Sequence, residues 1–151
     1  MDGSLLNKKS KKIIGRIEKI DLPELSIFNI DAKIDTGAYT SSLHCHDITV
    51  EKVKGRLYAK FYVLDPNHPE YEEKQYNAPV HKIKRVRSSN GEIEERVIIK
   101  QKIHFYGTLF KIQLSLTDRS KMKYPMLIGR RFLTDKFIVD VSQKFLSNQT
   151  N

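Results

Sequence analysis

Apolar and polar residues alternate along three stretches of this sequence, and this limits the folds open to it. The stretches are residues 28–34, 57–63 and 110–116, and the apolar members of the first are Phe28, Ile30, Ala32 and Ile34. Successive side chains of a strand point to opposite faces, so a period of two buries one face of each strand. The only helical segment expected is short, from about Gly129 to Lys136. Many short strands with one small helix predict an all-β domain whose sheet closes or folds over on itself.

Turn signals separate the predicted strands. Asn90-Gly91 lies between two strand-like segments, and this pair favours a tight hairpin because both residues tolerate positive φ. Residues 65–77, with Pro66 and Pro69, are typical of a longer loop that the Ala78-Pro79 step closes.

The chain of 151 residues has the size of one domain. We expect a flexible basic arm over residues 1–12, a folded domain over 13–146 and a polar tail over 147–151. Cys45 is the single cysteine, and no stretch is apolar enough for a signal peptide or a membrane span. A cytoplasmic protein is the simplest interpretation.

Basic residues outnumber acidic ones by 27 to 18, which gives a net charge of +9. Such a charge attracts acidic partners, such as nucleic acid, anionic lipid or an acidic peptide, but it is equally typical of a solvated surface.

The segment from Ala32 to Ala38 carries the sharpest chemical signal. A predicted strand delivers Asp35 on its polar face, and Thr36-Gly37 then turns the chain at once. Gly37 permits a tight bend, and the Thr36 hydroxyl can brace neighbouring backbone. Taken alone, this tripeptide is also compatible with an ordinary strand end at which Asp35 merely caps the turn.

A second segment, residues 124–133, runs from an apolar strand through Gly129 into the short helix. With Asp35-Thr36-Gly37-Ala38 early and Leu127-Ile128-Gly129 late, the chain resembles the retropepsin-like aspartic proteases. It is more similar still to a bacterial branch customarily labelled ATP-dependent zinc proteases, through residues 34–44, 87–91 and 116–130. The resemblance spans about residues 13–142.

The resemblance implies a single-lobe acid-protease β-barrel with one short C-terminal helix. It implies a catalytic Asp35-Thr36-Gly37 loop and structural support of that loop by Leu127, Ile128, Gly129 and Arg130. A hairpin from about Val80 to Gln101 corresponds to the flap that covers substrate. The expected substrate-binding residues are Ala38 and, at the flap tip, Arg87, Ser88, Ser89, Asn90 and Gly91. A solvated hairpin with cross-strand ion pairs explains the charges of this segment equally well.

Aspartic proteases use two carboxylates that share one proton, because like charges about 3 Å apart do not both ionise. This chain contains one Asp-Thr-Gly, and neither Asp118 nor Asp135 is followed by such a turn. The second carboxylate must therefore come from another copy, which predicts a twofold homodimer acting as an endopeptidase.

Members of the branch are linked by resemblance to ATP-grasp ligases that add glutamates to ribosomal proteins. An acidic, glutamate-rich peptide is therefore a candidate substrate, and such a ligase a candidate functional partner.

The sequence departs from the viral retropepsin pattern at the expected partner of Arg130. In viral retropepsins the residue four after the catalytic Asp is acidic and pairs with this Arg, whereas here it is Tyr39, so the partner of Arg130 is open.

A metal or nucleotide has little support in the sequence. His44 and His46 share one strand face, but a zinc site there is two ligands short, and no helical His-Glu-x-x-His or Gly-rich phosphate loop is present. We expect neither metal nor cofactor.

Two alternatives to a protease stay open. A non-catalytic β-barrel module could bind acidic peptides or a partner ligase without cutting them. A nucleic-acid-binding barrel has only the basic and aromatic residues of 56–62 in its favour, and is the weaker alternative.

Overall fold

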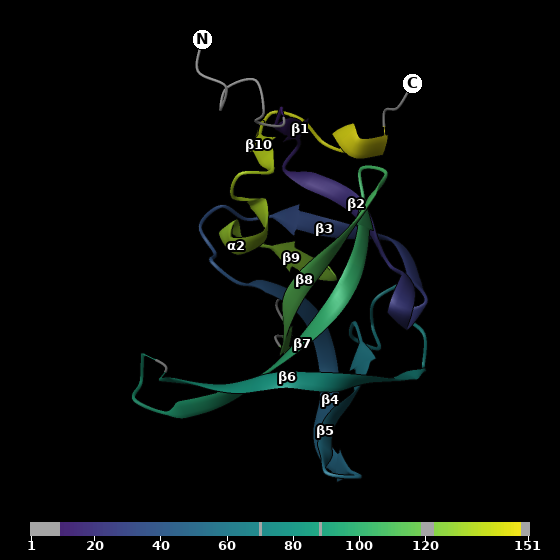
Figure 1. Cartoon of the computed structure of the whole chain (residues 1–151), viewed down its shortest axis with the longest axis vertical. Helices are drawn as coiled ribbons and strands as arrows, with labels where there is room; N and C mark the ends of the chain where they lie inside the picture. Colours follow the sequence, from purple (N-terminus) through teal and green to yellow (C-terminus); the bar gives the residue numbers. More distant parts are fainter. Residues whose placement is uncertain (1–9, 70, 88, 119–122, 149–151) are drawn as a thin grey trace.

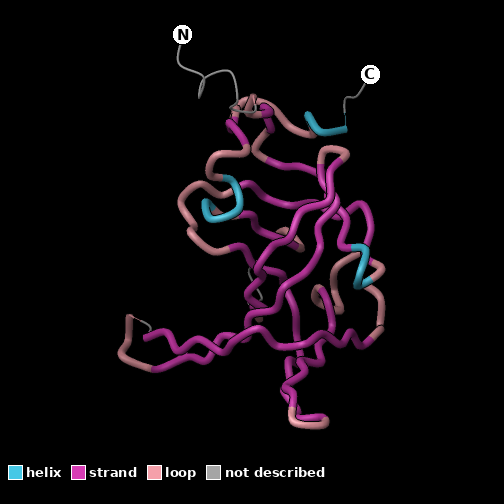
Figure 2. The backbone as a smooth tube through the Cα atoms, viewed as in Figure 1, coloured by secondary structure: helices cyan, strands magenta, loops and turns pink. Residues whose placement is uncertain are grey.

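The computed structural model describes residues 10–69, 71–87, 89–118 and 123–148, and strands dominate them (Figures 1 and 2). The strands are β1 (Lys12–Ile14), β2 (Ile17–Leu22), β3 (Ile27–Ile34), β4 (Ser41–Val53), β5 (Arg56–Val63), β6 (Gln75–Arg87), β7 (Ile93–Phe105), β8 (Thr108–Thr117), β9 (Met126–Ile128) and β10 (Phe137–Val139). The helix α2 (Arg130–Leu133) is short, and two 3-10 turns are η1 (Pro23–Leu25) and η2 (Leu146–Asn148). The predicted all-β, retropepsin-like class is confirmed. Within the described residues no helix is long and apolar enough to cross a membrane.

The main sheet closes on itself. Its strands follow the order β2-β3-β9-β4-β5-β6-β7-β8, and β2 also pairs with β7 while β4 also pairs with β8. The pairings β2–β3–β9–β4–β8–β7–β2 therefore form a ring. The inward side chains of this ring make up most of the core; they include Ile20, Ala32, Leu43, Ile99, Ile103, Leu114 and Met126, each at most 2% exposed. Closure removes free strand edges and gives the core a continuous wall.

Two long hairpins extend from this ring as separate arms (Figure 2). The β4–β5 hairpin turns at Gly55, and the β6–β7 hairpin pairs from Val80↔Ile99 out to Arg87↔Ile93. The predicted flap-like hairpin is thus present. Its turn is longer than the two-residue type expected, because five residues separate Arg87 from Ile93, and Gly91 has positive φ (87°) whereas Asn90 does not.

Two details of the strand predictions are wrong. Phe28 is 61% exposed and Ile27 takes its place in the core, because Asn29 adopts a left-handed conformation (φ 58°) that interrupts the alternation. The Asn29 amide donates to Asp21 Oδ1 (2.7 Å), which stabilises this kink. Strand β6 also begins at Gln75, inside the predicted loop, and includes Pro79 opposite Tyr58.

A buried carboxylate joins the two ends of the domain. Glu18, 0% exposed, accepts hydrogen bonds from the amides of Gly15 (2.6 Å), Leu146 (3.0 Å) and Ser147 (3.0 Å) and from the Ser147 hydroxyl (2.6 Å). Strand β1 pairs in parallel with β10 beside it. Ser147, expected at the start of a free tail, is therefore bonded to the domain, and Lys12, assigned to the arm, begins a strand.

Candidate active site

Asp35 lies where strand β3 ends, in a loop that crosses over a third strand. Strand β9 pairs with β3 in parallel (Ile34↔Ile128) and with β4 in antiparallel (Ser42↔Leu127). The loop of residues 35–40 therefore connects two strands that are separated by β9. The Asp35 amide donates to the Ile128 carbonyl (2.8 Å), so the loop begins from a fixed point of the sheet.

The Asp35 carboxylate is half-buried and points back onto its own turn. Asp35 Oδ1 accepts a hydrogen bond from the Gly37 amide (2.9 Å), and the backbone carbonyl of Asp35 accepts one from the Ala38 amide (3.2 Å). Thr36 contributes through its backbone: its carbonyl accepts a hydrogen bond from Arg130, while its hydroxyl has no hydrogen-bond partner among the described residues. The turn holds one carboxylate oxygen in place and leaves the side chain accessible.

Gly129 lets the following helix approach the loop closely. A Cβ atom at position 129 would lie 2.7 Å from the Tyr39 carbonyl oxygen and 2.8 Å from that of Ala38. Because position 129 has no side chain, the Arg130 amide donates to the Ala38 carbonyl (2.7 Å) and the Arg131 amide donates to the Tyr39 carbonyl (2.9 Å). The Gly129 amide donates to the buried Ser41 hydroxyl (3.0 Å). Of the residues predicted to support the loop, Ile128, Gly129 and Arg130 therefore contact it directly, and Leu127 lines the adjoining cavity.

The side chain of Arg130 also braces the loop. Its Nη1 donates to the Thr36 carbonyl (3.0 Å), and its guanidinium lies 5.8 Å from the centre of the Tyr39 ring. A backbone carbonyl and an aromatic face thus take the role that sequence comparison assigned to an acidic side chain. The partner of Arg130, left open by the sequence, is identified.

Asp35 opens into a cavity of about 300 Å³. Loop residues 38–40, Ser41, Ser42 and Leu127 line it together with Ser115 and Thr117 of β8 and Arg96 of β7. Arg96 is half-buried, and within the described residues its one ion pair is a long contact with Glu94 (3.8 Å). The sequence presented Arg96 only as one of several hairpin charges. Its closeness to the Asp35 loop follows from the ring closure through β8.

The flap-tip residues that the structure describes do not line this cavity within one chain. Arg87, Ser89, Asn90 and Gly91 are exposed at the end of the β6–β7 arm, and Ser88 is outside the described residues. The arm and the Asp35 loop extend toward the same side of the molecule (Figure 1). Of the predicted substrate-binding residues that the structure describes, Ala38 alone lines the cavity.

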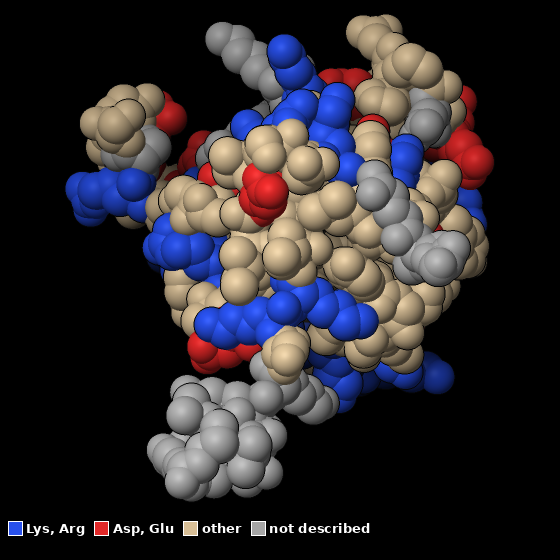
Figure 3. Space-filling model, turned by 90° about the horizontal axis from the view of Figure 1, so that it is seen from above, with Lys and Arg blue, Asp and Glu red and all other residues tan. Residues whose placement is uncertain are grey.

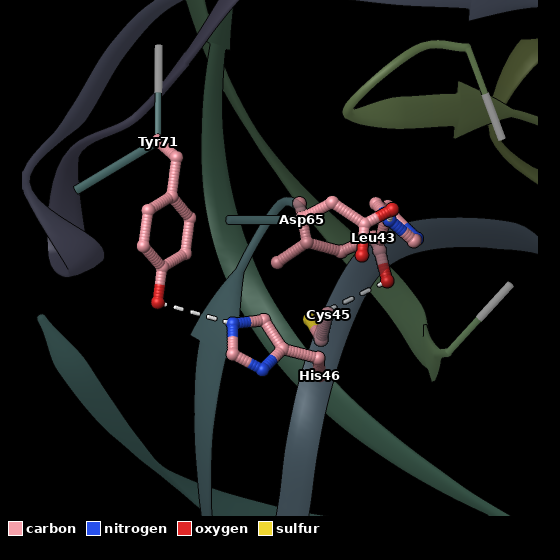
Figure 4. A network of polar contacts seen from close by, with 6 residues as sticks. Leu43, Cys45, His46, Asp65 and Tyr71 are labelled. Carbon is pink, nitrogen blue, oxygen red and sulfur yellow. Dashed lines mark hydrogen bonds and ion pairs between the residues drawn. The ribbon is translucent and has the colours of Figure 1, made fainter. Parts of the chain in front are cut away.

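The histidines near Cys45 are hydrogen-bonded to separate partners. His44 Nε2 lies 3.2 Å from Asp65 Oδ2, while His46 Nε2 lies 3.1 Å from the Tyr71 hydroxyl, toward which its ring is turned (Figure 4). Cys45 is buried between them, and burial, with a smaller effect of Asp118, raises the pKa of its thiol well above the usual value. Among the described residues no group of three or more potential ligands is arranged to hold a metal ion.

The basic and aromatic stripe on β5 makes contacts within the chain. Lys60 pairs with Glu51 (2.9 Å), and Tyr62 stacks on His46 with ring centres 5.2 Å apart. Lys60 and Tyr62 therefore already have partners within the chain.

Comparison with known proteins agrees with this geometry. A Legionella pneumophila crystal structure of a protein of unknown function superposes with a TM-score of 0.71 at 27% identity, covering 91% of this chain and 99% of that one. A probable alpha-L-glutamate ligase of Shewanella halifaxensis is 35% identical over 146 residues, and one of Desulfotalea psychrophila is 32% identical over 131. The matches cover 94% and 87% of this chain but 31% and 28% of those proteins, so the chain spans about a third of their length.

The family model of the retropepsin-like aspartic endopeptidase RimB matches residues 13–150. This range contains the Asp35 loop, strand β9, helix α2 and the β6–β7 arm. The chain therefore belongs to the RimB-like family of retropepsin-like aspartic endopeptidases.

Proposed function

We propose that this protein is a homodimeric aspartic endopeptidase in which each chain supplies one Asp35. The observation that carries the proposal is the accessible Asp35 carboxylate, which opens into a cavity on a loop braced by Gly129 and Arg130. The sequence has one Asp-Thr-Gly, and an aspartic peptidase needs two carboxylates. A second copy related by twofold symmetry supplies the missing one.

The chemistry follows from one proton shared by two carboxylates. The ionised Asp35 removes a proton from a water molecule, and the water oxygen bonds to the carbonyl carbon of the substrate. The protonated Asp35 of the partner chain gives its proton to the carbonyl oxygen, which forms a neutral diol. Transfer of a proton to the amide nitrogen then accompanies cleavage of the C–N bond. The β6–β7 arm, Arg87 to Gly91 included, closes over the substrate and excludes bulk water.

A glutamate-rich peptide is the proposed substrate. Arg96 presents a guanidinium to the Asp35 cavity, and a net charge of +9 attracts an acidic chain. The relatives named probable alpha-L-glutamate ligases carry a segment like this chain within longer proteins. Their names support a functional link between this peptidase and a ligase that forms glutamate chains.

The test compares Asp35→Asn with Asp31→Asn. Asp31 lies on β3, four residues before Asp35, is also half-buried and pairs with Lys19 (2.6 Å), so it controls for the loss of one carboxylate. Wild type and both variants are incubated with a glutamate-tailed peptide and a mixed peptide library from acidic to neutral pH, and products are read by mass spectrometry. Cleavage lost only in Asp35→Asn supports the proposal, whereas cleavage retained in that variant contradicts it.

Subunit mixing tests the shared site. If both Asp35 residues are needed, an equilibrated equal mixture of wild type and Asp35→Asn keeps about a quarter of the activity of the same total amount of wild type, because a quarter of random pairs have two intact chains. Independent single-chain sites would keep about half. A dimer that binds the peptide without cutting it would instead favour the non-catalytic module.

A further inference from the structure

A second cavity, of about 280 Å³, lies between β7, β8 and α2. Its charged lining residues are Lys100 of β7, Lys111 of β8, Arg131 of α2 and Lys136 just after the helix, and all four are exposed. Ile112, Gln113, Phe132 and Ser41 complete the lining. Four cations from four sequence positions thus surround one small space, which we call the basic pocket.

The positive charges of the basic pocket are not neutralised by the chain itself. No acidic residue lines it, and none of its four cations forms an ion pair within the described part of the chain. Lys136 donates to the Phe132 carbonyl (3.0 Å), which does not offset its charge. The nearby His81 responds to this field: desolvation first, and then Lys100, Lys82 and Arg131, lower its pKa.

Other parts of the surface are basic too, but the four cations of the basic pocket surround one cavity. On the face at which the two chain ends lie, Lys and Arg side chains also gather in groups (Figure 3). Some cations elsewhere have acidic neighbours, as in Lys19–Asp31 and Lys60–Glu51. Like charges gathered without such neighbours repel one another, and a bound polyanion relieves that repulsion.

The basic pocket adjoins the cavity that contains Asp35. Ser41 lines both, and the amide of Arg131 is bonded to the Tyr39 carbonyl of the catalytic loop (2.9 Å). The two cavities are therefore neighbours. Lysine ammonium groups bind separate carboxylates as point charges. Phe132, the aromatic lining residue, is 5% exposed and offers no ring on which a nucleobase could stack.

We propose that the basic pocket binds the carboxylate side chains of an acidic peptide whose neighbouring residues occupy the Asp35 cavity. The proposal rests on the proposed peptidase function, because it assigns the pocket to the same substrate. It adds a recognition site outside the catalytic loop. A run of acidic residues, rather than a single one at the cleaved bond, becomes the feature that is recognised.

Binding is measured with the full chain carrying Asp35→Asn, so that no cleavage interferes. The probe is fluorescein-labelled hexaglutamate, followed by anisotropy at low and at physiological salt, with hexaglutamine as the uncharged comparison. Lys100→Gln with Lys111→Gln removes two pocket charges. Lys52→Gln with Lys54→Gln removes two exposed charges from the β4–β5 hairpin, and either pair lowers the net charge of the Asp35→Asn parent by two. Thermal unfolding checks that both variants are folded.

The pocket variant is expected to bind hexaglutamate about tenfold more weakly, and the hairpin variant less than about twofold. Equal losses in the two variants would reduce the effect to net charge and overturn the proposal. So would undetectable binding of hexaglutamate by the parent, or a loss confined to a single-stranded RNA probe, which would indicate a nucleic-acid site.

A cleavage assay distinguishes failure of the basic-pocket proposal from failure of the proposed peptidase function. If wild type cleaves peptides in an Asp35-dependent way while the pocket variant binds hexaglutamate normally, the basic-pocket proposal alone fails. Pocket-dependent binding by a protein that cleaves nothing would overturn the peptidase and retain the acidic-peptide site.

Discussion

Glu18 provides a direct test of how the two ends of this domain are held together. Its two carboxylate oxygens accept four hydrogen bonds, from Gly15 and Leu146 on Oε2 and from the amide and hydroxyl of Ser147 on Oε1. The substitution Glu18→Gln keeps the size of the side chain but replaces one acceptor oxygen with an NH₂ donor. The amide therefore satisfies fewer of the four donors.

The loss can be estimated bond by bond. With NH₂ on the Ser147 side, the hydroxyl can rotate and accept, but the Ser147 amide loses its partner, which costs about 1 to 3 kcal/mol. The two remaining backbone bonds lose charge assistance, about 1 kcal/mol each. The lower desolvation penalty of a neutral amide offsets part of this. The expected loss is about 2 to 4 kcal/mol of unfolding free energy, a large share of the roughly 5 to 15 kcal/mol typical of a domain.

Urea unfolding followed by circular dichroism measures this loss, and Glu24→Gln is the matched control. Glu24 is exposed and accepts one backbone hydrogen bond, from Lys102 (2.7 Å), so its loss should stay below about 1 kcal/mol. Hydrogen exchange should show reduced protection at Gly15, Leu146 and Ser147 in Glu18→Gln. A loss no larger than that of Glu24→Gln, with unchanged exchange, would refute the reasoning.

Two further predictions concern the Asp35 loop and the buried thiol. In Gly129→Ala the new methyl meets two loop carbonyls, so the loop must move; we expect a stability loss of about 1 to 3 kcal/mol and roughly a hundredfold fall in Asp35-dependent peptide cleavage. Ile103→Val, which should cost about 1 kcal/mol far from the loop, should leave cleavage unchanged, and equal activity of the two variants would contradict the steric argument. Burial raises the pKa of the Cys45 thiol, so a disulfide reagent at pH 8 should label it far more slowly in native protein than in urea, and rapid native labelling would contradict its burial.

Local patterns allowed most strands to be predicted. The alternation over 57–63 and 110–116 correctly located β5 and β8, because a period of two reflects burial of one strand face and needs no knowledge of the partner strand. The same rule failed at Phe28, because the positive φ of Asn29 interrupts the alternation. Pro79 was taken as a loop boundary, although it lies inside β6 where a register shift follows it.

The candidate site was predictable in its parts and not in its assembly. Asp35, Gly37 and Gly129 stood out because a turn and a close backbone approach demand particular residue types. The position of Arg96 beside the Asp35 cavity could not be predicted, since it depends on strands β7 and β8 closing the ring beside the Asp35 loop. The same holds for Arg130, whose partner is a backbone carbonyl that any residue supplies.

The sequence alone determined the strand-rich class, the single Asp-Thr-Gly turn and the glycine that follows β9, because each depends on residue type and short spacing. Tertiary structure decided which distant segments meet: β9 between β3 and β4, Glu18 against Ser147, and four cations around the basic pocket. Such meetings depend on the balance between loop-closure entropy and the burial gained when the ring closes, and this balance is a property of the whole chain.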